Sequence, residues 1–190
     1  MEASSSDVNI PDSTITKNVF YEFMDSKVMY PSLSGYERDP FFINDGKGVF
    51  SDVAPAVGMD LVTDGRSVVS ADFDRDGDLD LLVRNLQNPR LLYFENVAPM
   101  TGHWLEVRLR GDPKYNRDAI GAKVLVETAT HKQKQLLVAG DGYLTQHWKG
   151  LWFGLGANDK VQRITVHWPD STETVLTDVA ADQIQTIAKK

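Results

Sequence analysis

The residues best suited to chemistry form one acidic stretch, ADFDRDGDLDLLV, at residues 71–83. Its aspartates are Asp72, Asp74, Asp76, Asp78 and Asp80. Carboxylates at positions 1, 3 and 5 of a tight loop converge on one point, position 7 can add a backbone carbonyl, and a glycine at position 6, here Gly77, supplies the sharp turn. Hard oxygen ligands at this spacing select calcium. The sequence therefore predicts a Ca²⁺ site with these five aspartates as ligands.

The surroundings of this loop distinguish it from the calcium loop of a helix–loop–helix sensor. Such a loop carries a bidentate glutamate at position 12, where this sequence has Val83. It also has helices on both sides, whereas the flanks here read as strands. Asp80, at position 9, can supply the last carboxylate from the start of the outgoing strand. We therefore expect a calcium site within a β-hairpin.

Two other interpretations of the acidic stretch are an exposed acidic turn and a catalytic pair of carboxylates. Four carboxylates within ~5 Å repel one another by kcal/mol amounts even at an effective dielectric of ~20. A divalent cation relieves that repulsion, which favours the metal site over the bare turn. Carboxylates that share a calcium stay ionised and cannot act as general acids. We therefore expect the calcium to fix the hairpin and not to perform chemistry.

Composition and charge exclude several classes of function. The chain has 190 residues, 42% of them hydrophobic, and a formal net charge of −7. That charge argues against nucleic-acid partners, which require a basic patch, and against docking on anionic membranes. No run reaches the ~18 apolar residues of a membrane span. There is no cysteine, which excludes disulfides and thiol catalysis.

Beyond residue 40 the chain consists of short apolar or alternating stretches between turn residues. In HWLEVRLRG, apolar residues at 105, 107 and 109 alternate with charged residues at 106, 108 and 110, as in a half-buried strand. The other predicted strands are 41–44, 49–53, 67–73, 79–85, 90–96, 122–128, 134–140, 151–156, 163–168, 173–179 and 183–188. About a dozen short strands at this spacing predict an all-β sandwich or barrel.

The first forty residues differ from the rest. Residues 1–18 are polar and read as a mobile arm. Residues 19–30, VFYEFMDSKVMY, suit either a short helix or a strand, and Pro31 ends either one. A composition shift near residues 97–102 indicates an internal boundary. We thus expect an N-terminal arm and loop at 1–40, a first unit at 41–98 and a β-sandwich at 99–190.

Several motifs in order resemble a known pair of domains. FFINDGKGVFSDVAPAVGMD and VVSADFDRDGDLDLLVRN resemble the lead-in and calcium hairpin of an FG-GAP/VCBS repeat. HWLEVRLRG, NRDAIGAKV, GDGYLTQ, LWFGLG and ITVHWPD resemble the ASPIC/UnbV domain of cartilage-acidic-protein-like proteins. The resemblance covers residues 35–190. It implies an all-β protein in which one FG-GAP-like calcium-binding hairpin unit is joined to an ASPIC/UnbV β-sandwich.

The sequence departs from this family in having one clear repeat. The resemblance implies several FG-GAP repeats in one chain, which together form a β-propeller of about seven blades. A propeller needs at least ~4 blades to close. The chain is therefore expected to be either the C-terminal piece of a longer protein or a minimal member whose single hairpin packs on the sandwich. Residues 1–10 lack the basic and apolar regions of a signal peptide, although processing could have removed one.

Six further residues are candidates for ligand binding in the second half. Asn116, Arg117 and Asp118 form either a polar clamp or a loop fixed by its own hydrogen bonds. Tyr143 and Gln146 lie on a glycine-bent loop that could hold a sugar ring or a peptide, or could form a bulge with a buried tyrosine. These residues and Trp104 make up the candidate set.

Trp104 is singled out among the four tryptophans because strict alternation places it on the polar face of its strand. It is therefore expected to be the most exposed of them, and Trp168, on the apolar face of its own strand, is expected in the core. Core packing is the favoured role for the tryptophans as a set.

The leading functional hypothesis is a non-catalytic, calcium-stabilised binding or adhesion module. It would work outside the cell or in the periplasm and bind carbohydrate or protein. One alternative is a calcium-dependent enzyme, a hydrolase or cyclase, with a pocket between the two halves, although no nucleophile–base pair can be assigned. Another is a structural subunit that self-associates through residues 1–30.

Overall fold

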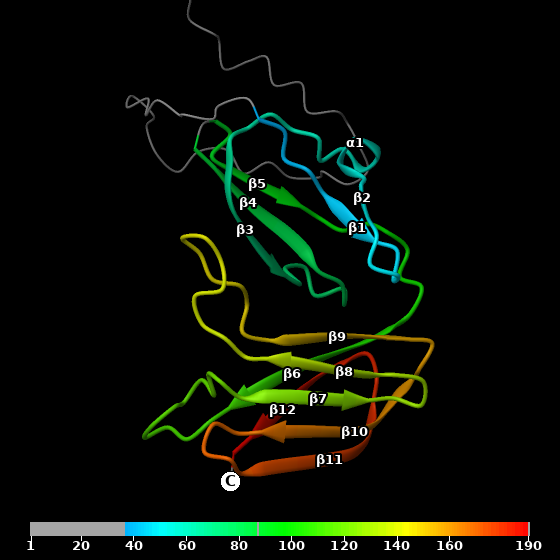
Figure 1. The fold of residues 1–190 in the computed structure, drawn as a ribbon, viewed down its shortest axis with the longest axis vertical. Coiled ribbons are helices and arrows are strands. Elements are labelled where there is room, and N and C mark those ends of the chain that lie inside the picture. The colour runs from blue at the N-terminus through cyan, green and yellow to red at the C-terminus, as the bar shows by residue number, and fades with distance from the viewer. Residues whose placement is uncertain (1–36, 87, 190) are drawn as a thin grey trace, which may run out of the picture. The chain divides into compact units, whose positions relative to one another are not determined.

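The computed structural model describes residues 37–86 and 88–189, and the predictions made for residues 1–30 lie outside that part. In the described residues there are twelve β-strands and one four-residue helix, so the protein is all-β as predicted (Figure 1). None of the described residues forms a helix long and apolar enough to cross a membrane.

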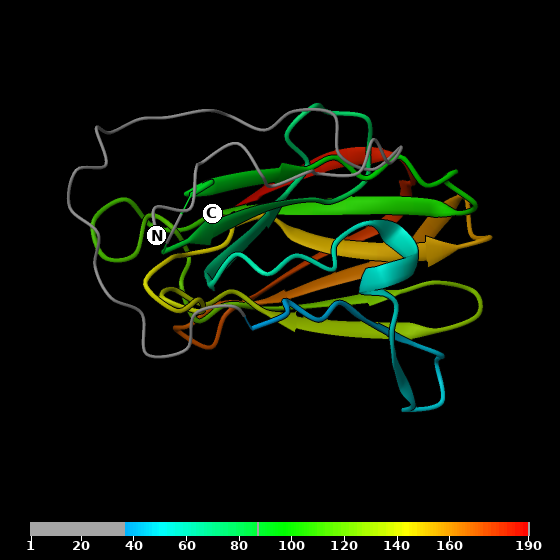
Figure 2. The ribbon, with the colours of Figure 1, turned by 90° about the horizontal axis from the view of Figure 1, so that it is seen from above.

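The elements follow the chain in a simple order. The strands are β1 (Phe42–Asn44), β2 (Phe50–Asp52), β3 (Gly65–Ala71), β4 (Asp80–Asn85), β5 (Leu91–Phe94), β6 (His103–Arg110), β7 (Lys123–Glu127), β8 (Lys132–Leu136), β9 (Leu151–Gly156), β10 (Lys160–His167), β11 (Glu173–Ala180) and β12 (Gln183–Ala188). The helix α1 (Ala54–Val57) follows β2 and is the cyan coil in Figure 2. The strand expected over 134–140 lies earlier, as β8, and residues 137–141 form a loop.

The described chain divides into two compact units. The first holds β1 to β5 and residues 142–145. The second holds β6 to β12 and also residues 74–78, the tip of the acidic loop. The predicted division between residues 98 and 99 stays a prediction.

In the first unit, two antiparallel sheets carry the strands. β1 pairs with β2, and β3, β4 and β5 form a three-stranded sheet in sequence order. The turn between β1 and β2 is fixed by Asp45, whose side chain accepts hydrogen bonds from the backbone N–H groups of Lys47 (2.7 Å) and Val49 (3.1 Å). Gly46 and Gly48 adopt positive φ there, which glycine does at no steric cost. DGKG, at residues 45–48, thus forms the turn of a β-hairpin.

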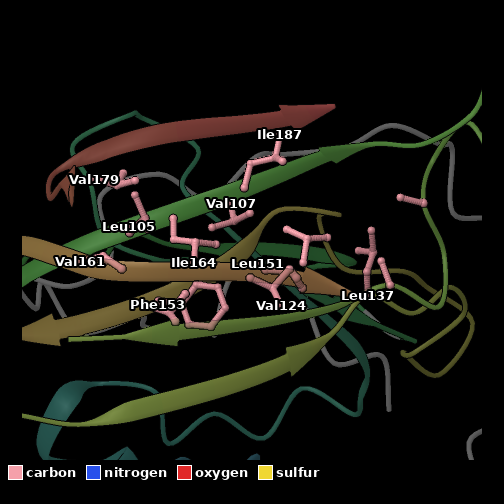
Figure 3. Packing of buried hydrophobic residues seen from close by; sticks show 14 of the residues in the cluster. Leu105, Val107, Val124, Leu137, Leu151, Phe153, Val161, Ile164, Val179 and Ile187 are labelled. Carbon is pink, nitrogen blue, oxygen red and sulfur yellow. The ribbon is translucent and has the colours of Figure 1, made fainter. Parts of the chain in front are cut away.

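In the second unit, two sheets with the orders β11-β10-β7-β8 and β12-β6-β9 enclose the core. β12 and β6 are parallel, and the remaining pairs are antiparallel. Leu105 and Val107 of β6, Phe153 of β9 and Ile164 of β10 are fully buried between the sheets (Figure 3). Sixteen buried residues form this cluster, so the alternation read from HWLEVRLRG places its apolar face correctly.

The edge strands β8 and β9 of these two sheets are linked by side chains. Gln133 donates a hydrogen bond from Nε2 to the carbonyl of Gly154, and Gln135 does the same to the carbonyl of Trp152. The two glutamines alternate with exposed lysines on β8. The amides thereby satisfy backbone acceptors of β9 that would otherwise face an open sheet edge.

Phe153→Ala should lower the free energy of unfolding by about 3–5 kcal/mol, because it leaves a cavity among fully buried neighbours. Urea denaturation followed by tryptophan fluorescence measures this change. Val175→Ala is the matched control, since Val175 lies on β11 with 45% of its surface exposed. Equal losses in the two variants would contradict the placement of the core.

Candidate metal centre

The acidic stretch forms the turn of the β3–β4 hairpin. Ala71, the last residue of β3, pairs with Asp80, the first residue of β4, so residues 72–79 make the connection. The hairpin prediction for this stretch is therefore met in the structure. Carboxylate oxygens of Asp72, Asp74 and Asp80 lie within 4.8 Å of one another. These residues occupy positions 1, 3 and 9 of the predicted loop.

Asp80 is the most firmly held of the three carboxylates. Its side chain is buried, and its Oδ2 accepts hydrogen bonds from the backbone N–H of Phe73 (3.0 Å) and the hydroxyl of Tyr93 (3.0 Å). Its Oδ1 accepts a third from the backbone N–H of Asn96 (2.9 Å). One carboxylate thus connects the acidic loop to β5 and to the chain that leaves it.

Asp74 and Asp76 fix the backbone of the loop through their side chains. The backbone N–H of Asp76 donates to Asp74 (3.2 Å), and that of Asp78 donates to Asp76 (3.1 Å). These are Asx turns. Asp76 and Asp78 do not belong to the group of carboxylates that converge, so the structure brings together three of the five predicted ligands.

Gly77 sits at the sharpest point of the loop, with φ of +103°. A Cβ atom at this position would lie 2.5 Å from Nε1 of Trp104, which belongs to the same unit. Backbone conformation and lack of space both require glycine here. The glycine expected from the loop pattern is therefore needed for its φ angle and also for its contact with the indole.

The donor set fits a calcium ion. The three converging groups are all carboxylates, and hard cations of this size take six to eight oxygen ligands in flexible geometry. Asp74 is exposed and Asp72 half-buried, so part of the coordination sphere is open to water. Asp72, Asp74 and Asp80 would hold the ion, which would screen their mutual repulsion.

The clamp residues predicted in the second half fix their own loop. Asn116 donates from Nδ2 to the carbonyl of Ile120 (2.8 Å) and accepts from the Ile120 N–H at Oδ1 (3.0 Å). Asp118 pairs with Lys149 (2.6 Å) and with Arg117 (3.1 Å). The hydrogen bond from Lys149, followed by that from Arg117, lowers the pKa of Asp118.

Tyr143 and Gln146 are both exposed, Tyr143 over 68% of its surface. A bridge between Gly142 and Thr145 closes the turn that carries Tyr143. The buried tyrosine offered as one reading of GDGYLTQ is therefore wrong. The role of these two side chains in ligand binding stays a prediction.

The order of exposure among the tryptophans differs from the one expected. Trp104 is half-buried and not exposed. Its ring stacks on that of Trp152, with ring centroids 4.7 Å apart and ring planes at an angle of 7°. Trp148 is the exposed one, at 52%. The prediction for Trp104 was wrong because alternation gives the direction of a side chain but not what covers it. Trp168 is buried, as predicted.

A cluster around Glu106 was not foreseen from the sequence. Glu106 is only 1% exposed, although alternation places it on the polar face of β6. Arg108 donates to both of its carboxylate oxygens (2.7 and 2.8 Å), and the indole N–H of Trp148 donates to Oε1 (2.6 Å). The guanidinium of Arg108 also lies 5.1 Å from the centre of the Trp148 ring. The only sequence signal for this cluster is the charge pair two residues apart on one strand.

Two families of known proteins match separate parts of the chain. Residues 32–83 match the FG-GAP-like repeat, and residues 111–190 match the family described as ASPIC and UnbV. The first match contains Asp72, Asp74 and Asp80. The second contains most of the β-sandwich unit.

Two relatives are similar to part of this chain. Cartilage acidic protein 1 of Xenopus tropicalis is 34% identical over 113 residues, which is 56% of this chain and 17% of the relative. Cartilage acidic protein 1 of Mus musculus is 38% identical over 85 residues, which is 42% of this chain and 12% of the relative. The chain thus spans less than a fifth of the length of these relatives.

These matches agree with the motifs read from the sequence and with the two all-β units of the structure. The chain therefore combines an FG-GAP-like repeat with an ASPIC/UnbV domain.

Proposed function

We propose that this chain is a calcium-stabilised, extracytoplasmic binding module that recognises carbohydrate or protein. The convergence of Asp72, Asp74 and Asp80 within 4.8 Å carries the proposal. A loop that is partly exposed and lacks a bidentate glutamate at position 12 suits weak calcium binding. Extracellular modules bind calcium with dissociation constants of about 10⁻⁴–10⁻³ M. The similarity to cartilage acidic protein 1 supports the same placement.

The calcium ion would link the acidic loop to β5 through Asp80. This residue is tied to Tyr93 and to the backbone of Asn96, so an ion held by the loop also fixes the end of β5. An ion that binds only the folded chain stabilises it by mass action, by about 2.7 kcal/mol at one hundred times its dissociation constant.

The exposed indole of Trp148 is the side chain best prepared for a partner. Its N–H is bonded to Glu106, and Arg108 lies against its ring. The ring is therefore held in one orientation while 52% of the residue's surface remains exposed. A rigid aromatic group loses little conformational entropy on binding, and tryptophan and arginine are enriched where binding energy concentrates.

Calcium should raise the melting temperature of the full chain, and EDTA should lower it again. At one hundred times the dissociation constant we expect a rise of roughly 5–10 °C. Asp74→Asn should abolish most of this response, because it removes one of three converging charges. Differential scanning fluorimetry across a calcium titration measures the effect.

Asp159→Asn is the control for charge, since Asp159 is exposed and lies outside the acidic loop. It should leave the calcium response unchanged. If the wild-type chain melts at the same temperature with calcium and with EDTA, the loop is only an acidic turn.

Glu106→Gln should destabilise the protein by about 1–3 kcal/mol, because a neutral amide cannot replace the charged acceptor beneath Arg108. It should also shift the tryptophan emission, since the Trp148 indole loses a charged partner. Glu173→Gln is the matched control. Its partner His167 lies 2.8 Å away, but both side chains are exposed, so its loss should cost about 0–1 kcal/mol.

Trp148→Ala should reduce binding at least tenfold to any carbohydrate or protein partner found by glycan-array and extracellular-protein-array screening of the calcium-loaded chain. Biolayer interferometry on the identified partner measures this. Tyr115→Ala is the comparison, because Tyr115 is 87% exposed and its ring makes no hydrogen bond or ring-stacking contact among the described residues. Equal effects of the two substitutions would argue against Trp148 as the anchor.

A further inference from the structure

The first unit contains a cavity of about 360 Å³ with an apolar lining. One wall is the sheet, to which β3, β4 and β5 all contribute. The facing wall is formed by residues 39–41 and by Met59 and Leu61. The backbone N–H of Asp39 donates to the carbonyl of Leu61 (3.1 Å), which holds the two parts of this second wall together.

The sheet wall is built from side chains in register. Val68, Val83 and Leu92 are direct cross-strand partners, and Leu81 is the partner of Phe94 in the next row. Leu92 and Phe94 are buried, whereas Val68 is 41% exposed. The floor of the cavity is therefore sheltered and its mouth is open.

Few apolar residues in the described part of this unit are buried. Its buried apolar residues are Ala54, Leu92 and Phe94. Large apolar side chains are exposed instead, among them Phe42, Ile43 and Phe50 on the β1–β2 hairpin. A soluble domain seldom leaves so much apolar surface in contact with water, and a surface of this kind marks a binding site.

We propose that residues 19–30 of this same chain occupy the cavity. In this segment, VFYEFMDSKVMY, eight of the twelve residues are apolar or aromatic. Burying a single large apolar side chain contributes about 1.5–3 kcal/mol. Two or three of these side chains in an apolar cavity would offset the cost of ordering the segment.

The connectivity of the chain favours this occupant over a separate molecule. The described structure begins at residue 37, and Asp39, Pro40 and Phe41 line the cavity. Eight residues, 31–38, lie between Tyr30 and Asp39. An extended chain covers about 3.3–3.6 Å per residue, so the segment can reach the mouth of the cavity. A tether this short gives an effective concentration in the millimolar range.

The inference concerns a site distinct from the calcium loop and from Trp148, and it does not depend on the proposed function. It differs from self-association through residues 1–30, because the occupant is bound within one molecule.

A spin label on residue 24 tests the proposal in the full, calcium-loaded chain. The protein has no cysteine, so Met24→Cys gives a single attachment site. We expect selective broadening of the amide signals of Val68, Val83 and Leu92. A label at Ile10→Cys, in the polar stretch 1–18, is the control and should give weaker broadening there.

Two outcomes of this experiment would overturn the proposal. One is broadening at the cavity no stronger from residue 24 than from residue 10. The other is broadening of an isotope-labelled, unmodified chain by an equal amount of spin-labelled, unlabelled chain, because this would mean that a second copy fills the cavity.

A stability comparison gives an independent test. The triple variant Phe20→Ser, Phe23→Ser, Met24→Ser should lower the melting temperature at saturating calcium by roughly 2–4 °C or more. Val8→Ser with Ile10→Ser is the matched control, because it removes apolar groups from the same arm outside the segment. Equal melting temperatures of wild type and triple variant would contradict the proposal.

Discussion

The buried carboxylate of Asp80 is the interaction on which the first unit most depends. A carboxylate taken out of water is costly unless it is fully hydrogen-bonded, and this one accepts three hydrogen bonds from Phe73, Tyr93 and Asn96. Its donors come from the acidic loop, from β5 and from the segment after β5. The same side chain lies beside Asp72 and Asp74, so the charge that organises the sheet also prepares the loop for a cation. Any cation held by the loop, as proposed, would therefore be coupled to the stability of the sheet through this one residue.

The second unit uses a buried carboxylate in a different way. Glu106 is neutralised within the protein by Arg108 and covered by the indole of Trp148, so it requires no external ion. The hydrophobic core of the second unit is one cluster of sixteen buried residues. The second unit is thus stabilised by its own core and by the pairing of Glu106 with Arg108. The buried carboxylate of Glu106 also orients the exposed ring of Trp148. This contrast is consistent with the proposed division of roles, in which the repeat would depend on calcium and the ASPIC/UnbV domain would carry the exposed aromatic ring toward a partner.

The sequence predicted those features that depend on neighbours along the chain. The all-β class and the acidic hairpin follow from local alternation and from loop spacing, and so does the burial of Leu105, Val107 and Trp168. Features that depend on long-range contacts were missed. Glu106 is buried because Trp148, 42 residues away in sequence, bonds to it. Trp104 is less exposed than expected because Trp152 stacks on it. Periodicity gives the direction of a side chain, but not which distant residue will cover it.

The two units also differ in how completely they bury apolar surface, and this difference has a physical consequence. The net stability of a folded protein is the small remainder of large opposing terms. A unit whose described part buries only three apolar residues, Ala54, Leu92 and Phe94, must therefore gain stability elsewhere. The proposed calcium ion would contribute at the β3–β4 turn, where the carboxylates converge. The cavity beneath Val68 lies on the apolar face of the β3–β4–β5 sheet, where a hydrophobic segment would contribute. Neither source can replace the other, because one relieves repulsion between charges and the other removes apolar surface from water. A single repeat can therefore remain folded if both act together, each on the term that the isolated sheet cannot satisfy by itself.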